Sequence, residues 1–117
     1  MYGDDRLIGK DSNAYLKHIL DAIGRIGKYT KGMDENSFYS SDLVQAAVIR
    51  EIQIIGEAAK MIDDDLKKKH AEIPWKSIVD MRDKLIHHYF GVDVKAVWKT
   101  VKEDIPALSD MLEHVLL

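Results

Sequence analysis

The sequence predicts an all-α protein, an antiparallel bundle of four main helices plus a short helix. Apolar residues recur at helical spacing along most of the chain, and no stretch alternates convincingly as a strand would. The two prolines and seven glycines leave long uninterrupted segments between them. The chain has 117 residues, no internal repeat and no low-complexity linker, so residues 1–117 are expected to form a single helical domain.

The first helix is predicted from about Ser12 to Thr30. Asp11 or Ser12 can cap its first turn, because short polar side chains accept hydrogen bonds from free backbone N–H groups. Its apolar residues recur on one face, as expected of a helix that packs on a core. Gly32 is a suitable C-terminal stop, and the polar segment 32–40 predicts a loop.

The second helix is predicted from residue 40 or 41 to residue 61 or 62. Its apolar residues cover well over a third of its circumference, which indicates a central helix or one buried on two sides. A narrower polar stripe is formed by Arg50, Gln53, Glu57 and Lys60. This stripe is interpreted as a solvated edge with ion pairs at helical spacing. The alternative hypothesis is that Arg50 and Glu57 line a cleft.

Residues 63–70 read DDDLKKKH and predict a short helix. Acidic residues at its start and basic residues at its end both favour the helix macrodipole. Pro74 then occupies a position suited to the first turn of a helix, and a helix is predicted over 74–88.

Gly91 interrupts the helical pattern after that segment. Asp93 is a good cap for the last helix, which is predicted to run from Val94 toward the C-terminus. Pro106 should kink that helix or restart it near Asp104, since proline cannot donate the helical hydrogen bond.

Composition limits the classes of function. The chain has no cysteine, which excludes disulfides and thiolate ligands and fits a cytoplasmic localisation. No apolar run approaches the ~20 residues of a membrane span, and acidic residues stand at the start of the chain where a signal peptide would be basic. The formal net charge of −3 weakly disfavours a nucleic-acid partner. A local basic patch, or one built by two chains, could still bind RNA.

Arg82 breaks the pattern of the helix predicted over 74–88. At ~100° per residue it projects from the middle of the apolar stripe. A guanidinium there must be paired, or must emerge into a polar cleft or an interface. Two readings are open, a buried ion pair, for example with Glu57, and a functional group. The apolar residues within ~80° of Arg82 are Trp75, Ile78, Val79, Leu85, Ile86, Tyr89 and Phe90.

His87 lies four residues after Asp83, a spacing at which the carboxylate can orient the imidazole. In a regular helix Arg82 and His87 point ~140° apart. They can converge only if the helix ends or distorts near residues 85–87, or if a second chain completes the site. The five histidines include no pair at helical ligand spacing, so no metal site is expected. The sequence has no glycine-rich phosphate loop, so no cofactor is expected.

The stretch RDKLIHHY (82–89) has the form Arg-x4-His-x-Tyr, with a polar residue after the arginine. It resembles the signature of the HEPN superfamily of small helical proteins, specifically its HepT-like branch. The resemblance covers nearly the whole chain from Ala14 onward. Further matching stretches are AIGRIGKYTKG (22–32), AVIREIQIIGEAAK (47–60), EIPWKSIVDMRDKLIHHYFGVD (72–93) and VWKTVKEDIPAL (97–108).

The resemblance implies a HEPN-like homodimer that acts as a metal-independent RNA endonuclease, the toxin of a toxin–antitoxin pair. It implies a small nucleotidyltransferase antitoxin as the partner, which in part of this branch transfers AMP to the motif tyrosine. Carried over by position, Arg82 and His87 are the catalytic pair, Asp83 supports them and Tyr89 is the AMP acceptor. Asp83 stands where the family often has asparagine.

The proposed chemistry is consistent with these residue types. RNA is cut without a metal when a base removes the 2′-hydroxyl proton and a cation stabilises the phosphorane, which leaves a 2′,3′-cyclic phosphate. His87 can be the base or the acid, and Arg82 can bind the non-bridging oxygens. Two alternatives remain, a non-catalytic helical module that docks a nucleotidyltransferase or RNA, and a helical dimer in which Arg82 belongs to a buried ion pair.

Overall fold

A computed structural model of the chain describes residues 5–87 and 91–116, with side chains described for residues 12–86 and 91–115. Most of these residues are helical, so the predicted all-α class is confirmed. The elements in chain order are α1 (Asp5–Tyr29), α2 (Glu35–Tyr39), α3 (Asp42–Met61), α4 (Asp64–Lys69), α5 (Trp75–Leu85), β1 (Ile86–His87), β2 (Gly91–Val92), α6 (Val94–Lys99), the π-helical turn η1 (Thr100–Asp104) and α7 (Ile105–Leu116).

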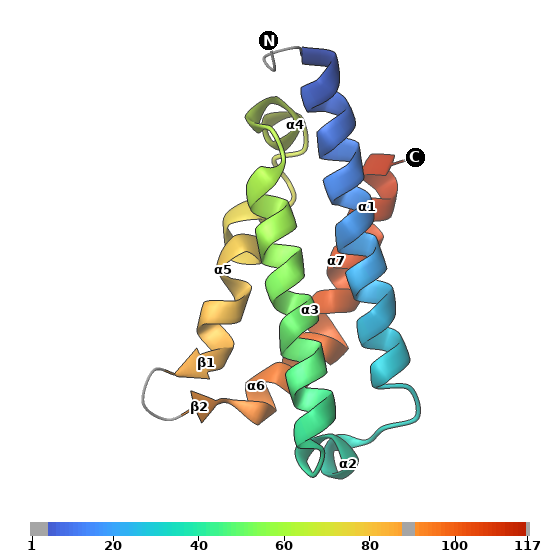
Figure 1. The fold of residues 1–117 in the computed structure, drawn as a ribbon, viewed down its shortest axis with the longest axis vertical. Coiled ribbons are helices and arrows are strands. Elements are labelled where there is room, and N and C mark those ends of the chain that lie inside the picture. The colour runs from blue at the N-terminus through green and yellow to red at the C-terminus, as the bar shows by residue number, and fades with distance from the viewer. Residues whose placement is uncertain (1–4, 88–90, 117) are drawn as a thin grey trace.

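Helix α3 is the centre of the arrangement, with α1 along one side and α5 along the other (Figure 1). Helix α7 packs against α1 behind it, and α6 lies to the left of the lower half of α3 in this view. One hydrophobic core joins these helices. Its fully buried side chains include Leu16, Ile19, Ile26, Phe38, Val48, Ile52, Ile55, Ile73, Val97 and Leu112.

The start of α1 differs from the prediction. The helix begins at Asp5, so the prediction that Asp11 or Ser12 caps it is wrong. Ser12 is buried inside the helix, where its hydroxyl donates to Oδ2 of Asp63 at 3.2 Å and accepts from the Asp63 N–H at 3.1 Å. Ser12 is of a type that suits a helix cap, but here it connects α1 to Asp63 at the start of α4.

The segment predicted as a loop, 32–40, contains the short helix α2. The Asp34 carboxylate accepts from the Ser37 N–H at 2.8 Å, and the Ser37 hydroxyl accepts from the Asp34 N–H at 2.9 Å. These bonds form a capping box, and the Ser37 N–H lowers the pKa of Asp34. Phe38 packs on Trp98 with ring centroids 5.0 Å apart. The loop prediction fails because tertiary burial of Phe38 stabilises a turn that is too short to show periodicity.

The predicted second helix and the predicted short helix are confirmed as α3 and α4. Asp63 caps α4 by accepting from the Leu66 N–H at 2.9 Å, and Asp93 caps α6 by accepting from the Ala96 N–H at 3.1 Å. The interruption predicted near Pro106 is confirmed as the turn η1, which ends at Asp104. Part of the apolar surface of α3 remains uncovered, because Leu43 is 80% exposed.

Candidate functional site

Arg82 borders a hollow of about 200 Å³ between α3 and α5. The hollow has a polar lining, with both acidic and basic side chains. Arg82 contributes from the last turn of α5, and its side chain is 42% exposed. The lining residues are Gln53, Gly56, Glu57, Lys60, Val79, Arg82 and Asp83.

Gly56 sets how closely the two walls of the hollow approach. A Cβ at this position would lie 3.0 Å from the carbonyl oxygen of Val79 on α5. That distance is tighter than nine in ten real Cβ contacts, so a larger residue would require the Val79 backbone to move by a few tenths of an ångström. Val79 stands one helical turn before Arg82, and the close packing at Gly56 therefore positions Arg82 beside α3.

The guanidinium of Arg82 is incompletely paired. Its Nε is buried, and among the described residues it is the one buried side-chain nitrogen or oxygen without a hydrogen-bond partner. Its Nη1 lies 3.6 Å from Oδ1 of Asp83, whose side chain is 77% exposed. That distance is an ion pair rather than a hydrogen bond. Arg82 thus keeps donors that can bind an anion in the hollow.

The buried ion pair considered between Arg82 and Glu57 is not formed. Glu57 lines the same hollow, but its Oε1 accepts from Nε2 of Gln53 at 3.2 Å. Arg50 is exposed on α3 and is not among the residues that line the hollow. Of the two predicted cleft residues, the structure brings only Glu57 to Arg82, and it adds Lys60 from the same polar stripe.

Helix α5 ends at Leu85, so the prediction of a helix through residue 88 is wrong. Ile86 pairs with Val92 and His87 with Gly91 in a two-residue antiparallel ladder, and the Asp93 N–H donates to the Leu85 carbonyl oxygen at 2.9 Å. Gly91 has a φ of +77°, a conformation that glycine adopts without strain. These cross-strand hydrogen bonds replace the helical ones after Leu85.

The early end of α5 bears on the predicted catalytic pair. Arg82 lies on the helix and His87 on β1, so the ~140° separation of a regular helix does not apply to them. Their convergence required either that the helix end near residues 85–87 or that a second chain complete the site. The first of these conditions is met. The side chain of His87 lies outside the described residues, as does Tyr89 as a whole.

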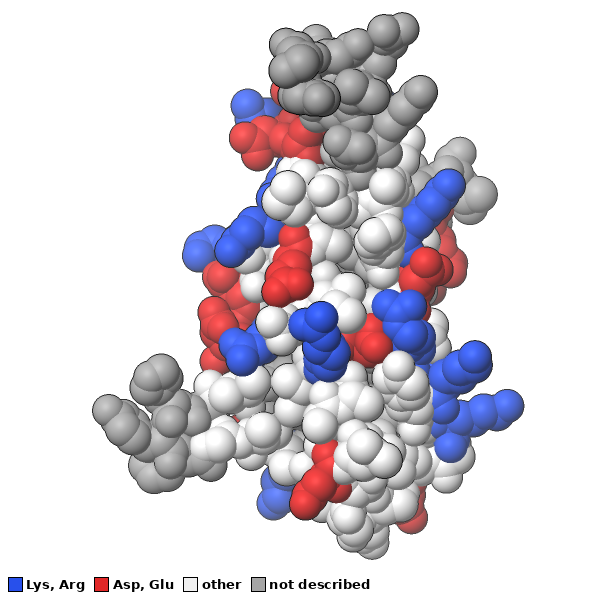
Figure 2. All heavy atoms as spheres, viewed as in Figure 1, with Lys and Arg blue, Asp and Glu red and all other residues white. Residues whose placement is uncertain are grey.

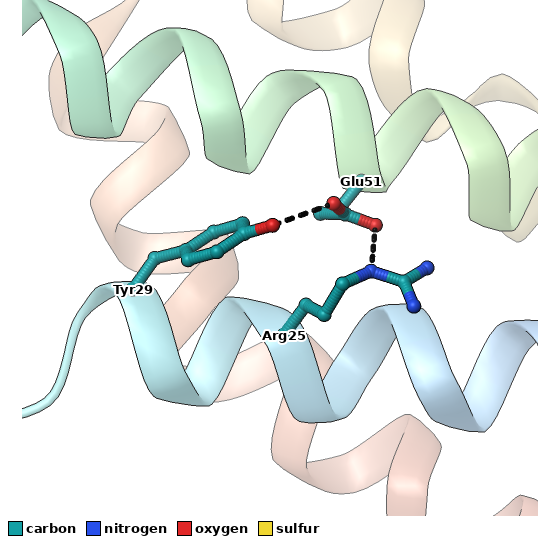
Figure 3. Close-up of polar contacts among 3 residues, drawn as sticks. All are labelled: Arg25, Tyr29 and Glu51. Carbon is teal, nitrogen blue, oxygen red and sulfur yellow. Dashed lines mark hydrogen bonds and ion pairs between the residues drawn. The ribbon is translucent and has the colours of Figure 1, made fainter.

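A second polar cluster lies on the other side of α3 (Figure 3). Oε1 of the buried Glu51 accepts from Nε of Arg25 at 2.8 Å, and its Oε2 accepts from the Tyr29 hydroxyl at 3.1 Å. These bonds to Glu51 raise the pKa of both Arg25 and Tyr29. The cluster was not predicted. Glu51 stands between the buried Val48 and Ile52. The criterion that identified Arg82 as unusual, a charged residue among apolar ones on a helix, would also have identified Glu51.

Within the described residues, no three or more His, Asp or Glu side chains gather in a way that could hold a metal ion. In the same residues, each helix is too short or too polar to span a bilayer.

Comparison with known proteins supports the resemblance to the HepT-like branch. Residues 19–115 match the family described as "Ribonuclease HepT-like". The chain is 52% identical over 101 residues to "Probable ribonuclease HepT" of Thermococcus cleftensis, a match that covers 86% of this chain and 92% of the relative. It is 41% identical over 106 residues to a "Putative RNase" of Methanocaldococcus jannaschii, covering 91% of this chain and 97% of the relative.

A third relative, also from Methanocaldococcus jannaschii, is named as a gamma-glutamylcyclotransferase and "putative RNase". It is 46% identical over 107 residues, which are 92% of this chain but 48% of that longer relative. No solved structure was found to match. The family match spans most of the chain and includes the Arg82 helix and its hollow, and the chain therefore belongs to the HepT-like ribonuclease family.

Proposed function

We propose that this protein is a metal-independent RNA endonuclease in which Arg82 and His87 act on the scissile phosphodiester. The observation that carries the proposal is the half-exposed Arg82 guanidinium, which borders an open polar hollow and whose nearest carboxylate is the exposed Asp83, 3.6 Å from Nη1. A cation held in this way suits a phosphate oxygen. The RNase names of the relatives support the same class of reaction.

In the proposed reaction, a base removes the proton of the 2′-hydroxyl and the 2′-oxygen attacks phosphorus. The bond to the 5′-oxygen breaks, that oxygen receives a proton from an acid, and a 2′,3′-cyclic phosphate remains. His87 serves as the base or as the acid, since imidazole titrates near neutral pH. Arg82 stabilises the charge on the non-bridging oxygens. Asp83, whose Oδ1 lies 3.6 Å from Nη1 of Arg82, is the supporting residue of the pair.

The proposal includes a homodimer, so that two Arg82 and two His87 side chains serve one cleft. A dimeric cleft would also concentrate basic groups in a chain whose formal net charge is −3. The biological setting we propose is a toxin–antitoxin pair, with a nucleotidyltransferase antitoxin that silences the enzyme by transferring AMP to Tyr89. A nucleotide on the motif tyrosine would add bulk and negative charge to the RDKLIHHY motif.

RNA cleavage by the purified protein in EDTA tests the catalytic assignment. We expect cleavage that leaves a 2′,3′-cyclic phosphate, and a loss of about 10²- to 10⁴-fold in rate for Arg82→Ala and for His87→Ala. The control is His114→Ala, which removes an exposed histidine whose Nδ1 lies 2.7 Å from the Asp110 carbonyl oxygen on α7. Wild-type cleavage rates in both the Arg82 and His87 variants would rule the assignment out.

Intact mass measured after incubation with the nucleotidyltransferase and ATP tests the proposed regulation. We expect a gain of one or more AMP masses in the wild-type protein and no gain in Tyr89→Phe. The matched control is Tyr39→Phe, a tyrosine of α2 with a partly buried side chain. Modification at another residue, together with no RNA cleavage, would support a non-catalytic docking module instead.

A further inference from the structure

One face of α3 is only partly covered by the rest of the chain. Its residues lie within ~60° of Leu43 on a helical wheel. Among the residues described, four large hydrophobic side chains are exposed, and two of them, Leu43 (80%) and Met61 (58%), mark the two ends of this face. We call this surface the α3 face, and its residues are Leu43, Ala46, Ala47, Arg50, Ile54, Glu57 and Met61.

Uncharged side chains cover most of the surface over α3, and few charged ones interrupt them (Figure 2). An exposed apolar surface of this kind on a helix is typical of a protein–protein contact. The sequence predicted a helix that is central or buried on two sides, and α1 and α5 cover two of its sides, while Leu43 and Met61 remain exposed on a third. The missing cover is therefore expected from another molecule.

Two charges on the α3 face are arranged to complement each other in a second copy. Arg50 and Glu57 are seven residues apart, or about 10.5 Å along the helix, on the same side. Within the described residues Arg50 has no ion-pair partner, and Glu57 accepts only from Gln53. If two α3 helices pack antiparallel, Arg50 of each copy meets Glu57 of the other. A parallel pairing in register would instead place like charges together.

We infer that the α3 face is the interface of a homodimer in which two α3 helices pack antiparallel about a two-fold axis beside residues 53 and 54. In this register Arg50 is opposite Glu57 of the other copy, and Met61 is opposite the small Ala46. Closed two-fold pairing uses the same surface on both subunits, as this face requires. The inference rests on the proposed function for the homodimer and specifies how the two subunits meet.

This arrangement has a consequence for the Arg82 hollow. The α3 face has α1 on one flank and α5 on the other (Figure 1). The two-fold axis runs from the α1 flank to the α5 flank, at right angles to α3. Rotation about this axis therefore keeps both α5 helices on the same side of the dimer. Glu57 belongs to both the face and the hollow. The two hollows therefore open beside the same interface, offset by about 9 Å along the helix direction.

Charge reversal tests the interface. Sedimentation or light scattering over a dilution series should show a wild-type dimer, and at least a tenfold weaker dimer for Arg50→Glu and for Glu57→Arg. The double variant Arg50→Glu/Glu57→Arg restores opposite charges and should recover dimerisation. Glu113→Arg reverses an exposed charge on α7 and should have no effect. Circular dichroism checks that each variant is folded.

Cysteine cross-linking tests the register, because the natural chain has no cysteine. Ile54→Cys places one thiol beside the axis in each copy and should form a disulfide-linked dimer on mild oxidation. Leu43→Cys lies on the same face, but in the antiparallel arrangement its two copies are about 30 Å apart, far beyond disulfide reach. Leu43→Cys should therefore stay monomeric on a denaturing gel.

Several results would overturn this inference. They are a monomeric wild-type protein, unchanged dimerisation in both single charge reversals, no recovery in the double variant, or cross-linking of Leu43→Cys in preference to Ile54→Cys. None of these depends on RNA cleavage. A protein that dimerises and cleaves RNA through Arg82 but fails the charge-reversal or cross-linking tests would retain the proposed function and lose the α3 interface.

Discussion

Arg25 and Arg82 lie on opposite flanks of α3, and each side chain is 42% exposed. Their partners are very different. Arg25 donates from Nε at 2.8 Å to the buried Glu51, whose other oxygen is occupied by Tyr29. Arg82 has a buried Nε without a partner, and its nearest carboxylate is the exposed Asp83 at 3.6 Å.

The comparison shows that two equally exposed arginines differ in whether the fold supplies a fixed counter-charge. The Arg25 charge is balanced by a carboxylate that the fold holds in place, so the cluster joins α1 to α3. Arg82 lacks such a balance, and its charge is available to a ligand.

The largest expected effect separates the two arginines by activity. Arg82→Met should lower the rate of RNA cleavage by about 10²-fold or more, because the side chain proposed to bind the phosphate is lost. Its free energy of unfolding should be unchanged or higher, since an unpaired buried donor is replaced by an apolar group of similar shape. Arg25→Met should leave the cleavage rate unchanged. Initial rates and urea unfolding of both variants measure these effects.

A result in which Arg82→Met cleaves at the wild-type rate, or in which both variants lose the same activity, would remove the distinction between the arginines. A strong loss of stability in Arg82→Met would instead favour the purely structural reading of that residue.

The next effect concerns the packing that holds Arg82 beside α3. Gly56→Ala should destabilise the protein by about 1–3 kcal/mol, because the added Cβ would lie 3.0 Å from the Val79 carbonyl oxygen. It should also lower the cleavage rate by moving α5. Gly24→Ala is the matched control, a helical glycine of α1 whose Cβ would meet nothing within 4 Å. That change should stabilise by about 0.4–1 kcal/mol.

Urea unfolding compares the two glycine variants directly. Equal stability changes of the same sign would mean that backbone entropy alone governs both positions. In that case the close approach of α3 and α5 would not constrain Gly56.

The smallest effect is a pH dependence of the Arg25–Glu51–Tyr29 cluster. The hydrogen bond to Glu51 raises the pKa of Tyr29 above its ordinary value of 10.0. A group with a raised pKa stabilises the fold below its unfolded-state pKa, and this stabilisation is lost as the pH rises through the folded-state pKa. The wild-type protein should therefore unfold at a higher temperature than Tyr29→Phe at pH 7 to 9.

That difference in unfolding temperature should shrink above about pH 10. Thermal unfolding of both proteins between pH 7 and pH 11 measures it. A difference that stays constant over the whole range would show that the hydroxyl adds nothing through its bond to Glu51. Tyr39→Phe serves as the control, because Tyr39 lies away from this cluster on α2.

The sequence by itself determined the helical class, the course of α3 and α4, the cap Asp93, and the unusual position of Arg82. Each of these depends on residues within a few positions of one another, through periodicity or through a side chain that bonds a nearby N–H. The roles proposed for His87 and Tyr89 also come from the sequence, and they remain predictions.

Tertiary structure alone decided the features that join distant segments. Helix α5 ends at Leu85 because the residues after Gly91 fold back and supply cross-strand hydrogen bonds, a competition that a helical wheel cannot include. Beside the hollow, Gly56 lets the Val79 backbone of another helix approach α3 closely. Arg82 lacks a buried counter-charge while Arg25 has Glu51, and this difference arises from how α1 and α5 pack on α3, which no local pattern contains.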